Sequence, residues 1–193
     1  MYSMNDVKIL VFVGMSGSGK TTAIDYLTEK GIPKIYFGGI IYQAMREAGI
    51  EITPESQQRF REEIRQKEGK DFVIKRVLKE IQDLINAGQK RIVLDGLYSW
   101  TEYKILKKAY PTETTVIAII LPRALRHHRV AERPDRPFNA QEINERDWSE
   151  LENLEKGAPI AIADYYLENS GSISDLHKQL EQLLKDIDFL PKS

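Results

Sequence analysis

The sequence predicts an α/β fold in which helices cover both faces of a five-stranded parallel sheet. Short, unbroken apolar segments alternate along the chain with longer segments whose apolar residues recur at helical spacing. An unbroken apolar run is typical of a strand buried on both faces, as the strands of parallel sheets are. The length of 193 residues suffices for one substantial core, so we expect a single domain over residues 1–193.

Each element is expected where this pattern is bounded by residues that start or stop regular structure. The five strands are expected at residues 9–13, 34–37, 91–95, 115–120 and 165–167. The helices are expected at residues 22–30, between Gly39 and Ala48, and then at residues 54–68, 70–87, 100–108, 140–156 and 176–187. Thr53, Ser99 and Asn139 precede three of these helices, and each side chain can accept a hydrogen bond from the first turn.

The segment between the first strand and the first helix reads Gly-Met-Ser-Gly-Ser-Gly-Lys-Thr, from Gly14 to Thr21. It fits the phosphate-binding pattern G-x-x-x-x-G-K-[ST], in which glycines let backbone N–H groups wrap around phosphate oxygens at a helix N-terminus. Lys20 would bridge the β- and γ-phosphates, and the Thr21 hydroxyl would bind Mg²⁺. We therefore expect a site for ATP and Mg²⁺. Its expected residues are Gly14, Ser16, Gly17, Ser18, Gly19, Lys20, Thr21 and Thr22.

A carboxylate follows the third apolar run. Asp95 ends this strand and is followed by Gly96, whereas motor and transport ATPases usually place a water-activating Glu directly after such an Asp. No hydrolytic base is evident, so we expect Asp95 to organise Mg²⁺ or to accept a proton from the acceptor. Ligands of parallel sheets bind at the carboxyl ends of the strands, so the loop, Gly38–Gly39 and Asp95 are expected to converge.

An arginine-rich segment follows the fourth strand, and we expect it to form a lid at residues 122–147. Its arginines at 123, 126, 129, 133 and 136 face only two acidic residues. A basic arm that closes over phosphates favours transfer to an acceptor other than water. We expect Arg126 to bind the nucleotide, and Arg129, Arg133 and Arg136 to act in catalysis. A solvated helix face would explain about half of these arginines equally well, and His127 and His128 are expected to be an exposed pair without carboxylate partners.

Composition excludes several classes of function. The net charge of −1 gives no sign of a nucleic-acid or membrane partner, and the absence of cysteine excludes thiol chemistry and suits the cytoplasm. The early apolar run is too short to span a membrane. The sequence has no Asn-Lys-x-Asp motif for guanine recognition. Oligomeric state is not readable from the sequence.

Together, these features resemble the P-loop nucleoside monophosphate kinases and dephospho-CoA kinases, and in particular a prokaryotic group described as dephospho-CoA-kinase-related or adenylate-kinase-like. The resemblance covers nearly the whole chain. It is carried by the phosphate loop and by the segments at residues 95–100, 145–147, 154–161, 163–165 and 169–172. It implies a three-layer P-loop NTPase fold, an ATP·Mg²⁺ donor site that includes Asn169, a mobile lid and a nucleotide-like acceptor.

The acceptor site is expected at residues 38–70 and at the end of the third strand. Both arginines that adenylate kinases use to grip an acceptor phosphate are replaced here, in stretches that contain Tyr42 and Tyr98. Those rings would stack on a base or a pantetheine-like arm, while Arg65 would supply the missing charge. An Arg on such a charged helix is also explained by salt bridges on a solvent face. The expected acceptor-site residues are Gly39, Tyr42, Arg65, Gly96, Tyr98 and Arg146.

The leading hypothesis is an ATP-dependent small-molecule kinase with a nucleotide or nucleotide-like acceptor. Two alternatives stay open: a dephospho-CoA kinase, which phosphorylates a ribose hydroxyl, and an ATP-binding regulator that has lost transfer. The replaced acceptor arginines favour the regulator, whereas intact Lys20, Thr21 and Asp95 favour an enzyme. A nucleic-acid-processing ATPase is disfavoured by the near-neutral charge.

Overall fold

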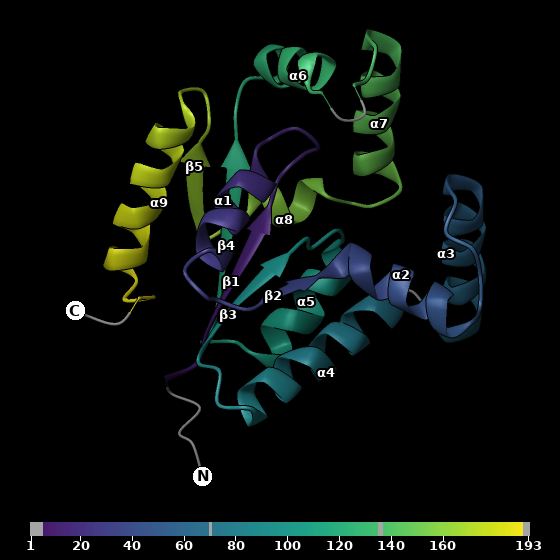
Figure 1. The fold of residues 1–193 in the computed structure, drawn as a ribbon, viewed down its shortest axis with the longest axis horizontal. Helices are drawn as coiled ribbons and strands as arrows, with labels where there is room; N and C mark the ends of the chain where they lie inside the picture. The colour runs from purple at the N-terminus through teal and green to yellow at the C-terminus, as the bar shows by residue number, and fades with distance from the viewer. Residues whose placement is uncertain (1–5, 70, 135–136, 191–193) are drawn as a thin grey trace.

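The computed structural model describes residues 6–69, 71–134 and 137–190, apart from a few side chains of one helix. Within these residues five strands form one sheet: β1 (Lys8–Val13), β2 (Lys34–Tyr36), β3 (Arg91–Asp95), β4 (Thr114–Ile120) and β5 (Tyr165–Glu168). The strands lie in the order β2-β3-β1-β4-β5, and every pairing is parallel (Figure 1). The predicted five-stranded parallel sheet is therefore confirmed.

Helices cover both faces of this sheet. They are α1 (Lys20–Thr28), α2 (Phe37–Glu47), α3 (Pro54–Glu68), α4 (Phe72–Asn86), α5 (Trp100–Ala109), α6 (Arg123–Glu132), α7 (Ala140–Glu152), α8 (Gly157–Ala161) and α9 (Ile173–Asp186). The alternation of side chains along β1 divides the core into two clusters. Ile9 and Val11 pack with residues of α2, α4 and α5, whereas Leu10 and Phe12 pack with residues of α1 and α9. The three-layer α/β prediction is confirmed.

The predicted helix starts are also confirmed. The Thr53 hydroxyl accepts a hydrogen bond of 3.1 Å from the Ser56 N–H at the start of α3. Ser99 and Asn139 each form a reciprocal capping box with a glutamate three residues later. These caps satisfy N–H groups that the first turn of a helix leaves free, so they fix where α3, α5 and α7 begin.

Some boundaries differ from those expected. Gly38 and Gly39 do not form a loop after the second strand, because α2 begins directly after Tyr36. Helix α1 begins at Lys20, two residues early, and α7 ends at Glu152, four residues short of its predicted end. The short helix α8 was not expected.

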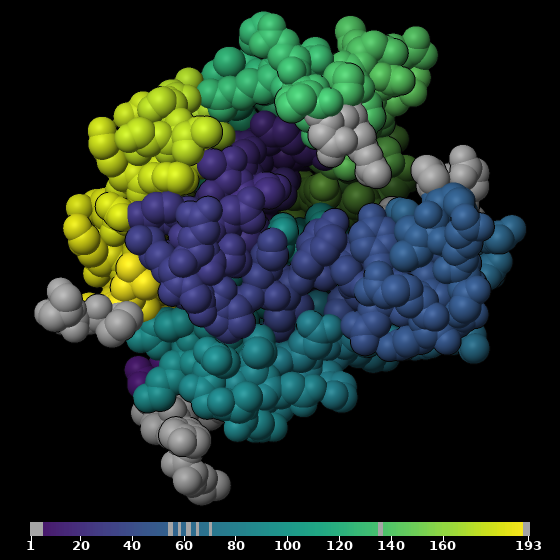
Figure 2. Space-filling view, viewed as in Figure 1, coloured from purple at the N-terminus to yellow at the C-terminus, as the bar shows by residue number. Residues whose placement is uncertain are grey.

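Two arms of helices stand on either side of the carboxyl ends of β1 and β3 (Figure 1). Helices α6 and α7 contact each other beyond the end of β4, and α2 contacts α3 on the other side (Figure 1). The surface is hollowed between the α6–α7 arm and the α2–α3 arm (Figure 2). In the described part of the chain, no helix is both long and apolar enough to cross a membrane.

Candidate functional site

The loop between β1 and α1 has a backbone that glycine adopts readily and other residues rarely adopt. The φ angles are 82° at Gly17 and 97° at Gly19. A methyl group on Gly17 would lie 2.2 Å from Val130 Cγ2 of α6, and one on Gly19 would lie 2.2 Å from Asn169 Nδ2. The same Asn169 amide donates a hydrogen bond of 2.9 Å to the Ser18 carbonyl. The loop is thus a tight cradle, closed over by α6 and by the residue that follows β5.

The remaining loop residues lie where the sequence pattern predicts them. Gly14 is buried directly after β1, and Thr21 and Thr22 lie in the first turn of α1, whose N-terminus the loop therefore surrounds. The Ser18 hydroxyl is buried, and none of the described residues gives its oxygen a hydrogen-bond partner. This curved backbone at a helix N-terminus is the arrangement that binds phosphate.

Lys20 is the main positive charge of this cradle. Its Nζ donates hydrogen bonds of 2.7 Å to the Gly14 carbonyl and 3.2 Å to the Met15 carbonyl. No carboxylate among the described residues lies within ion-pair distance of it. Burial, with a smaller contribution from the nearby Lys156 ammonium, lowers the pKa of Lys20 to about 8. A partly buried ammonium without a bonded anion fits a triphosphate ligand, which would supply that anion.

The expected metal residues fit Mg²⁺ as part of such a complex. Thr21 is exposed at the start of α1, and Asp95 ends β3, which pairs with β1 beside the loop. Burial raises the pKa of Asp95, while the charges of Lys34 and Lys20 oppose that rise. Among the described residues, no cluster of three or more His, Cys, Asp or Glu side chains suits a metal. Two protein ligands leave most of the coordination sphere to phosphate and water, as Mg²⁺ prefers.

Arg126 of α6 does not point freely into the site. Its guanidinium forms two hydrogen bonds, of 2.7 and 2.6 Å, with the buried carboxylate of Asp147 on α7, and a third of 3.0 Å with the Ser16 carbonyl. His127 Nε2 also lies 2.8 Å from Asp147 Oδ2. His128 pairs with Glu132, one helical turn later. The expectation that His127 and His128 lack carboxylate partners is therefore wrong. This network joins α6 to α7 and both to the loop.

The other lid arginines are placed differently from one another. Arg129 donates a hydrogen bond of 2.5 Å to the Asn169 carbonyl and one of 3.0 Å to the Gly171 carbonyl, so it ties α6 to the segment after β5. The Arg133 guanidinium lies 5.0 Å from the centre of the Phe138 ring. Arg136 lies outside the described residues. The structure brings Arg126 to the phosphate loop and Arg129 to the segment after β5, and both engage protein groups there.

Helix α7 contributes two further side chains to the apex of the loop. Arg146 donates a hydrogen bond of 2.7 Å to the Ser16 hydroxyl. Glu150 accepts one of 3.0 Å from the Ser16 N–H and a very short one from the Ser16 hydroxyl. Glu150 also pairs at 2.8 Å with Lys156, which stands just before α8. The sequence analysis missed Glu150 and Lys156, and only the family-like stretch at 154–161 drew attention to that region.

A small pocket lies between the phosphate loop and the residues that follow β3. Its lining residues are Phe12, Val13, Gly14, Lys20, Gly96, Leu97, Tyr98, Lys156 and Ile160. The φ angle of Gly96 is 99°, and a methyl group there would lie 2.6 Å from the Tyr98 ring. Gly96 and Tyr98, both predicted for the acceptor site, therefore stand next to the donor lysine.

The other predicted acceptor residues do not line this pocket. Gly39 and Tyr42 lie on α2, where Gly39 packs beside Tyr36 and Tyr42 is partly buried. Arg65 lies on α3, and its side chain is outside the described residues. Arg146 contacts the phosphate loop instead of the α2–α3 region.

Several solved structures with a similar fold are named as kinases of small molecules. They include a sugar kinase from Janibacter (TM-score 0.59, 18% identical, 96% of each chain covered). A shikimate kinase from Aquifex aeolicus has a TM-score of 0.57 at 17% identity, covering 93% of this chain and 98% of that one. A dephospho-CoA kinase from Campylobacter jejuni has a TM-score of 0.56 at 16% identity, covering 96% and 98%. The fold is that of P-loop kinases, as the resemblance implied.

The sequence comparisons place the chain in a family. Residues 10–153 match a family described as an AAA domain. A UPF0200 protein from Thermococcus kodakarensis is 31% identical over 93% of this chain and 97% of its own length, and one from Sulfurisphaera tokodaii is 34% identical over 95% and 99%. A UPF0200/UPF0201 protein from Archaeoglobus fulgidus is 32% identical, and the chain spans only 55% of that longer relative. Because relatives of more than 30% identity match almost the whole chain and almost their own whole length, the chain belongs to the UPF0200 family.

Proposed function

We propose that this protein is an ATP-dependent kinase that transfers the γ-phosphate to a nucleotide or nucleotide-like small molecule. The observation that carries the proposal is the place of Lys20. Its ammonium lies in the phosphate cradle and also lines the pocket that Gly96 and Tyr98 share. A phosphate held by Lys20 would therefore face an acceptor bound in that pocket, as in-line transfer requires.

The residues of the chain have separate tasks in this proposal. Backbone N–H groups from Gly17 to Thr21 would hold the phosphates of ATP, and Thr21 and Asp95 would hold Mg²⁺, which would supply charge neutralisation for phosphoryl transfer. Asp95 would also accept the proton of an acceptor hydroxyl, and burial raises its pKa, which favours that task. Arg146 reaches Ser16 at the apex of the loop and adds positive charge beside the γ-phosphate.

The acceptor is proposed to enter between the two arms. The α2–α3 arm at residues 38–70 would hold its remote part, through Gly39, Tyr42 and Arg65, and the pocket would hold its reacting group. A phosphate acceptor and a ribose hydroxyl, as in dephospho-CoA, fit this proposal equally. The lid at residues 122–147 would exclude water, with Arg133 and Arg136 turning inward on closure.

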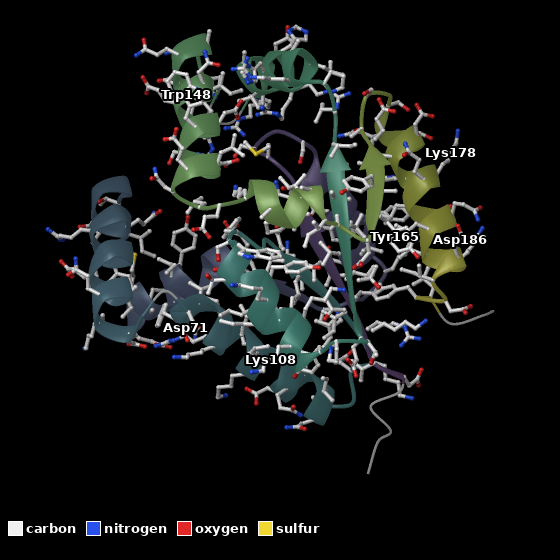
Figure 3. All side chains as sticks on the ribbon, turned by 180° about the vertical axis from the view of Figure 1, so that it is seen from behind. Asp71, Lys108, Trp148, Tyr165, Lys178 and Asp186 are labelled. Atoms are coloured by element: carbon white, nitrogen blue, oxygen red, sulfur yellow. The ribbon has the colours of Figure 1, made fainter. Side chains whose placement is uncertain are left out.

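One observation favours a second candidate, a non-catalytic ATP-binding regulator. Arg126 is committed to Asp147, and Arg129 to two backbone carbonyls, so neither guanidinium is held for a phosphate. In that case binding of ATP would rearrange α6 and α7 without phosphoryl transfer. Trp148 lies on α7 and is 59% exposed (Figure 3), so its fluorescence can report such a rearrangement.

The test combines binding with a transfer screen. Calorimetry measures the affinity for ATP·Mg²⁺, and the screen offers nucleoside monophosphates, dephospho-CoA, shikimate and simple sugars with radiolabelled ATP. The kinase proposal expects transfer to at least one of the first two classes, which the Lys20→Ala variant abolishes together with tight binding. ATP binding that changes Trp148 fluorescence but gives no transfer to any acceptor would support the regulator. Failure to bind ATP would contradict both.

A further inference from the structure

The strongest unassigned feature of the site is a buried ion pair, Glu150 with Lys156. Their side chains are only 3% and 7% exposed, and 2.8 Å separates Lys156 Nζ from Glu150 Oε1. Burial lowers the pKa of Lys156, whereas the carboxylate opposite it acts in the other direction. Burial likewise opposes the ionisation of Glu150, but Lys156 and Ser16 hold the pKa of that carboxyl below its ordinary value. The short contact therefore has the geometry of an ion pair closed off from solvent.

The pair lies at the boundary between the phosphate loop and the acceptor pocket. On one side, the Glu150 carboxylate accepts the hydrogen bond of the Ser16 N–H, a loop donor of the type that binds phosphate oxygens. On the other side, Lys156 lines the same pocket as Lys20 and Gly14, and its Nζ lies 4.9 Å from the centre of the Tyr98 ring. A carboxylate thus occupies an anion position of the loop, next to a lysine that faces the transfer pocket.

We propose that Lys156 binds the terminal phosphate of the donor nucleotide, which replaces Glu150 as its partner. This inference rests on the proposed function, because it assigns a residue to the γ-phosphate of the same ATP. Glu150 then acts as a positioning residue that keeps Lys156 charged and placed until the nucleotide binds. On binding, the phosphate takes the Ser16 N–H, and the Glu150 carboxylate turns to Arg146, whose Nε already lies 3.3 Å away.

Two features argue against a purely structural ion pair. A structural connection between α7 and the loop would be at least as stable with apolar side chains, since burying two charges costs more than their attraction usually returns. The lysine stem is also flexible and carries a compact charge, which suits a group that exchanges one anion for another better than the rigid guanidinium of Arg126. By contrast, Arg126 and Asp147 form the two-bond geometry expected of a fixed pair.

The test compares affinity for a triphosphate and a diphosphate, so it needs no knowledge of the acceptor. Calorimetry measures the dissociation constants of the Mg²⁺ complexes of ADP and of the non-hydrolysable triphosphate adenylyl imidodiphosphate. In the Lys156→Gln variant, ADP affinity should stay within about twofold, while the preference for triphosphate over diphosphate falls by about tenfold. Lys156→Arg should restore part of that preference. The matched control is Lys107→Gln, which removes a partly buried lysine paired with Asp164 away from the loop.

A second variant tests the exchange of partners. Glu150→Gln removes the competing charge, so the triphosphate should bind at least about threefold more tightly relative to ADP. Circular dichroism confirms that each variant is folded, and if Lys156→Gln does not fold, Glu150→Gln and Lys156→Arg still test the proposal. Unchanged triphosphate preference in the folded variants would overturn this inference alone. If the unmodified protein binds neither nucleotide, the inference and the proposed function both fail.

Discussion

Replacing Lys20 with methionine should make the free protein more stable while it abolishes nucleotide binding. Burial shifts the pKa of Lys20 from 10.5 to about 8, and each pKa unit corresponds to about 1.36 kcal/mol, so the charged lysine costs about 3 kcal/mol of folding free energy. The variant also loses hydrogen bonds to the Gly14 and Met15 carbonyls, at about 1 kcal/mol or less each. The net gain is about 1–2 kcal/mol, or a melting temperature higher by roughly 2–8 °C in a chain of this size.

The pH dependence of this gain has a definite sign. Below pH 8, Lys20 is protonated in both the folded and the unfolded protein, so the full cost is present. Between pH 8 and 10.5 the folded protein releases the proton first, so the unfolded state binds more protons and the stability of the unmodified protein rises. The advantage of Lys20→Met should therefore be largest at pH 7 and should shrink as the pH approaches 10.5.

Thermal denaturation followed by circular dichroism, at pH 7 and at pH 10, measures both effects. Lys107→Met is a useful control, because that lysine pairs with Asp164 and its loss should lower the melting temperature. Addition of ATP·Mg²⁺ should raise the melting temperature of the unmodified protein but not that of Lys20→Met. If the unmodified protein melts at or above the temperature of Lys20→Met at pH 7, the lysine is not an uncompensated buried charge and the reasoning is refuted.

Three further outcomes are expected. The affinity for ATP should fall above pH 8, by up to about tenfold per pH unit, because Lys20 of the nucleotide-free protein loses its proton there. The Lys20→Arg variant should not show this pH dependence. An affinity of the unmodified protein that does not change with pH would contradict this prediction. Asp95→Asn should lower turnover by about a hundredfold or more with little change in melting temperature, whereas the exposed control Asp83→Asn should leave turnover unchanged. Near-normal turnover of Asp95→Asn with a lower melting temperature would show that Asp95 has a structural role. Arg126→Ala should cost about 3–5 kcal/mol of stability, because it leaves Asp147 buried and unpaired, and the double change Arg126→Met, Asp147→Asn should recover part of the loss. A stable Arg126→Ala variant with reduced turnover would instead assign Arg126 to catalysis.

The fold was predictable because its information is local. Each strand of the sheet is a short apolar run, and the phosphate loop is one contiguous pattern, so neither needs knowledge of distant residues. The misplaced boundary at Gly38 shows where local rules fail. Glycine disfavours helices, but Phe37, Ile40 and Ile41 are buried against the core, and this packing outweighs the cost of two glycines. A side chain at position 38 would also lie 2.4 Å from the Tyr36 ring.

The missed helix α8 has a different cause. It is five residues long, which is too short to show helical periodicity, and it contains Pro159, which suggests a turn when seen in sequence. Lys156 stands immediately before it, and the chain folds back so that its N–H bonds the Glu150 carbonyl at 3.1 Å. The site residues of this region are therefore positioned by a bend that no local pattern reveals.

The carboxylate partners of the site were not predictable for a further reason. Glu150 is 134 positions from Ser16 along the chain, and Asp147 is 21 from Arg126, so their pairing depends on how α6 and α7 stand over the loop. From the sequence alone, the segment from 123 to 136 has a local excess of positive charge. The compensating carboxylate, Asp147, lies on another helix and so does not appear in that local pattern. In the folded protein Arg126 holds α6 to α7 and reaches the loop, whereas Arg129 binds the segment after β5.

That division bears on how the lid can move. Arg126 and Asp147 join α6 to α7 through buried bonds, so the two helices should move as one body, whereas Arg129, Arg146 and Glu150 connect this body to the loop and to the segment after β5. The connecting contacts involve phosphate-loop backbone, a loop hydroxyl or the carbonyls that follow β5, and phosphate oxygens can replace the acceptor or anion in each of them. The bonds between Arg126 and Asp147 are buried between α6 and α7, so they hold the unit together. A nucleotide entering the cradle would therefore exchange contacts at one edge of a rigid unit. Lys20, which pairs with no carboxylate among the residues that the structure describes, supplies the attraction that makes the exchange favourable.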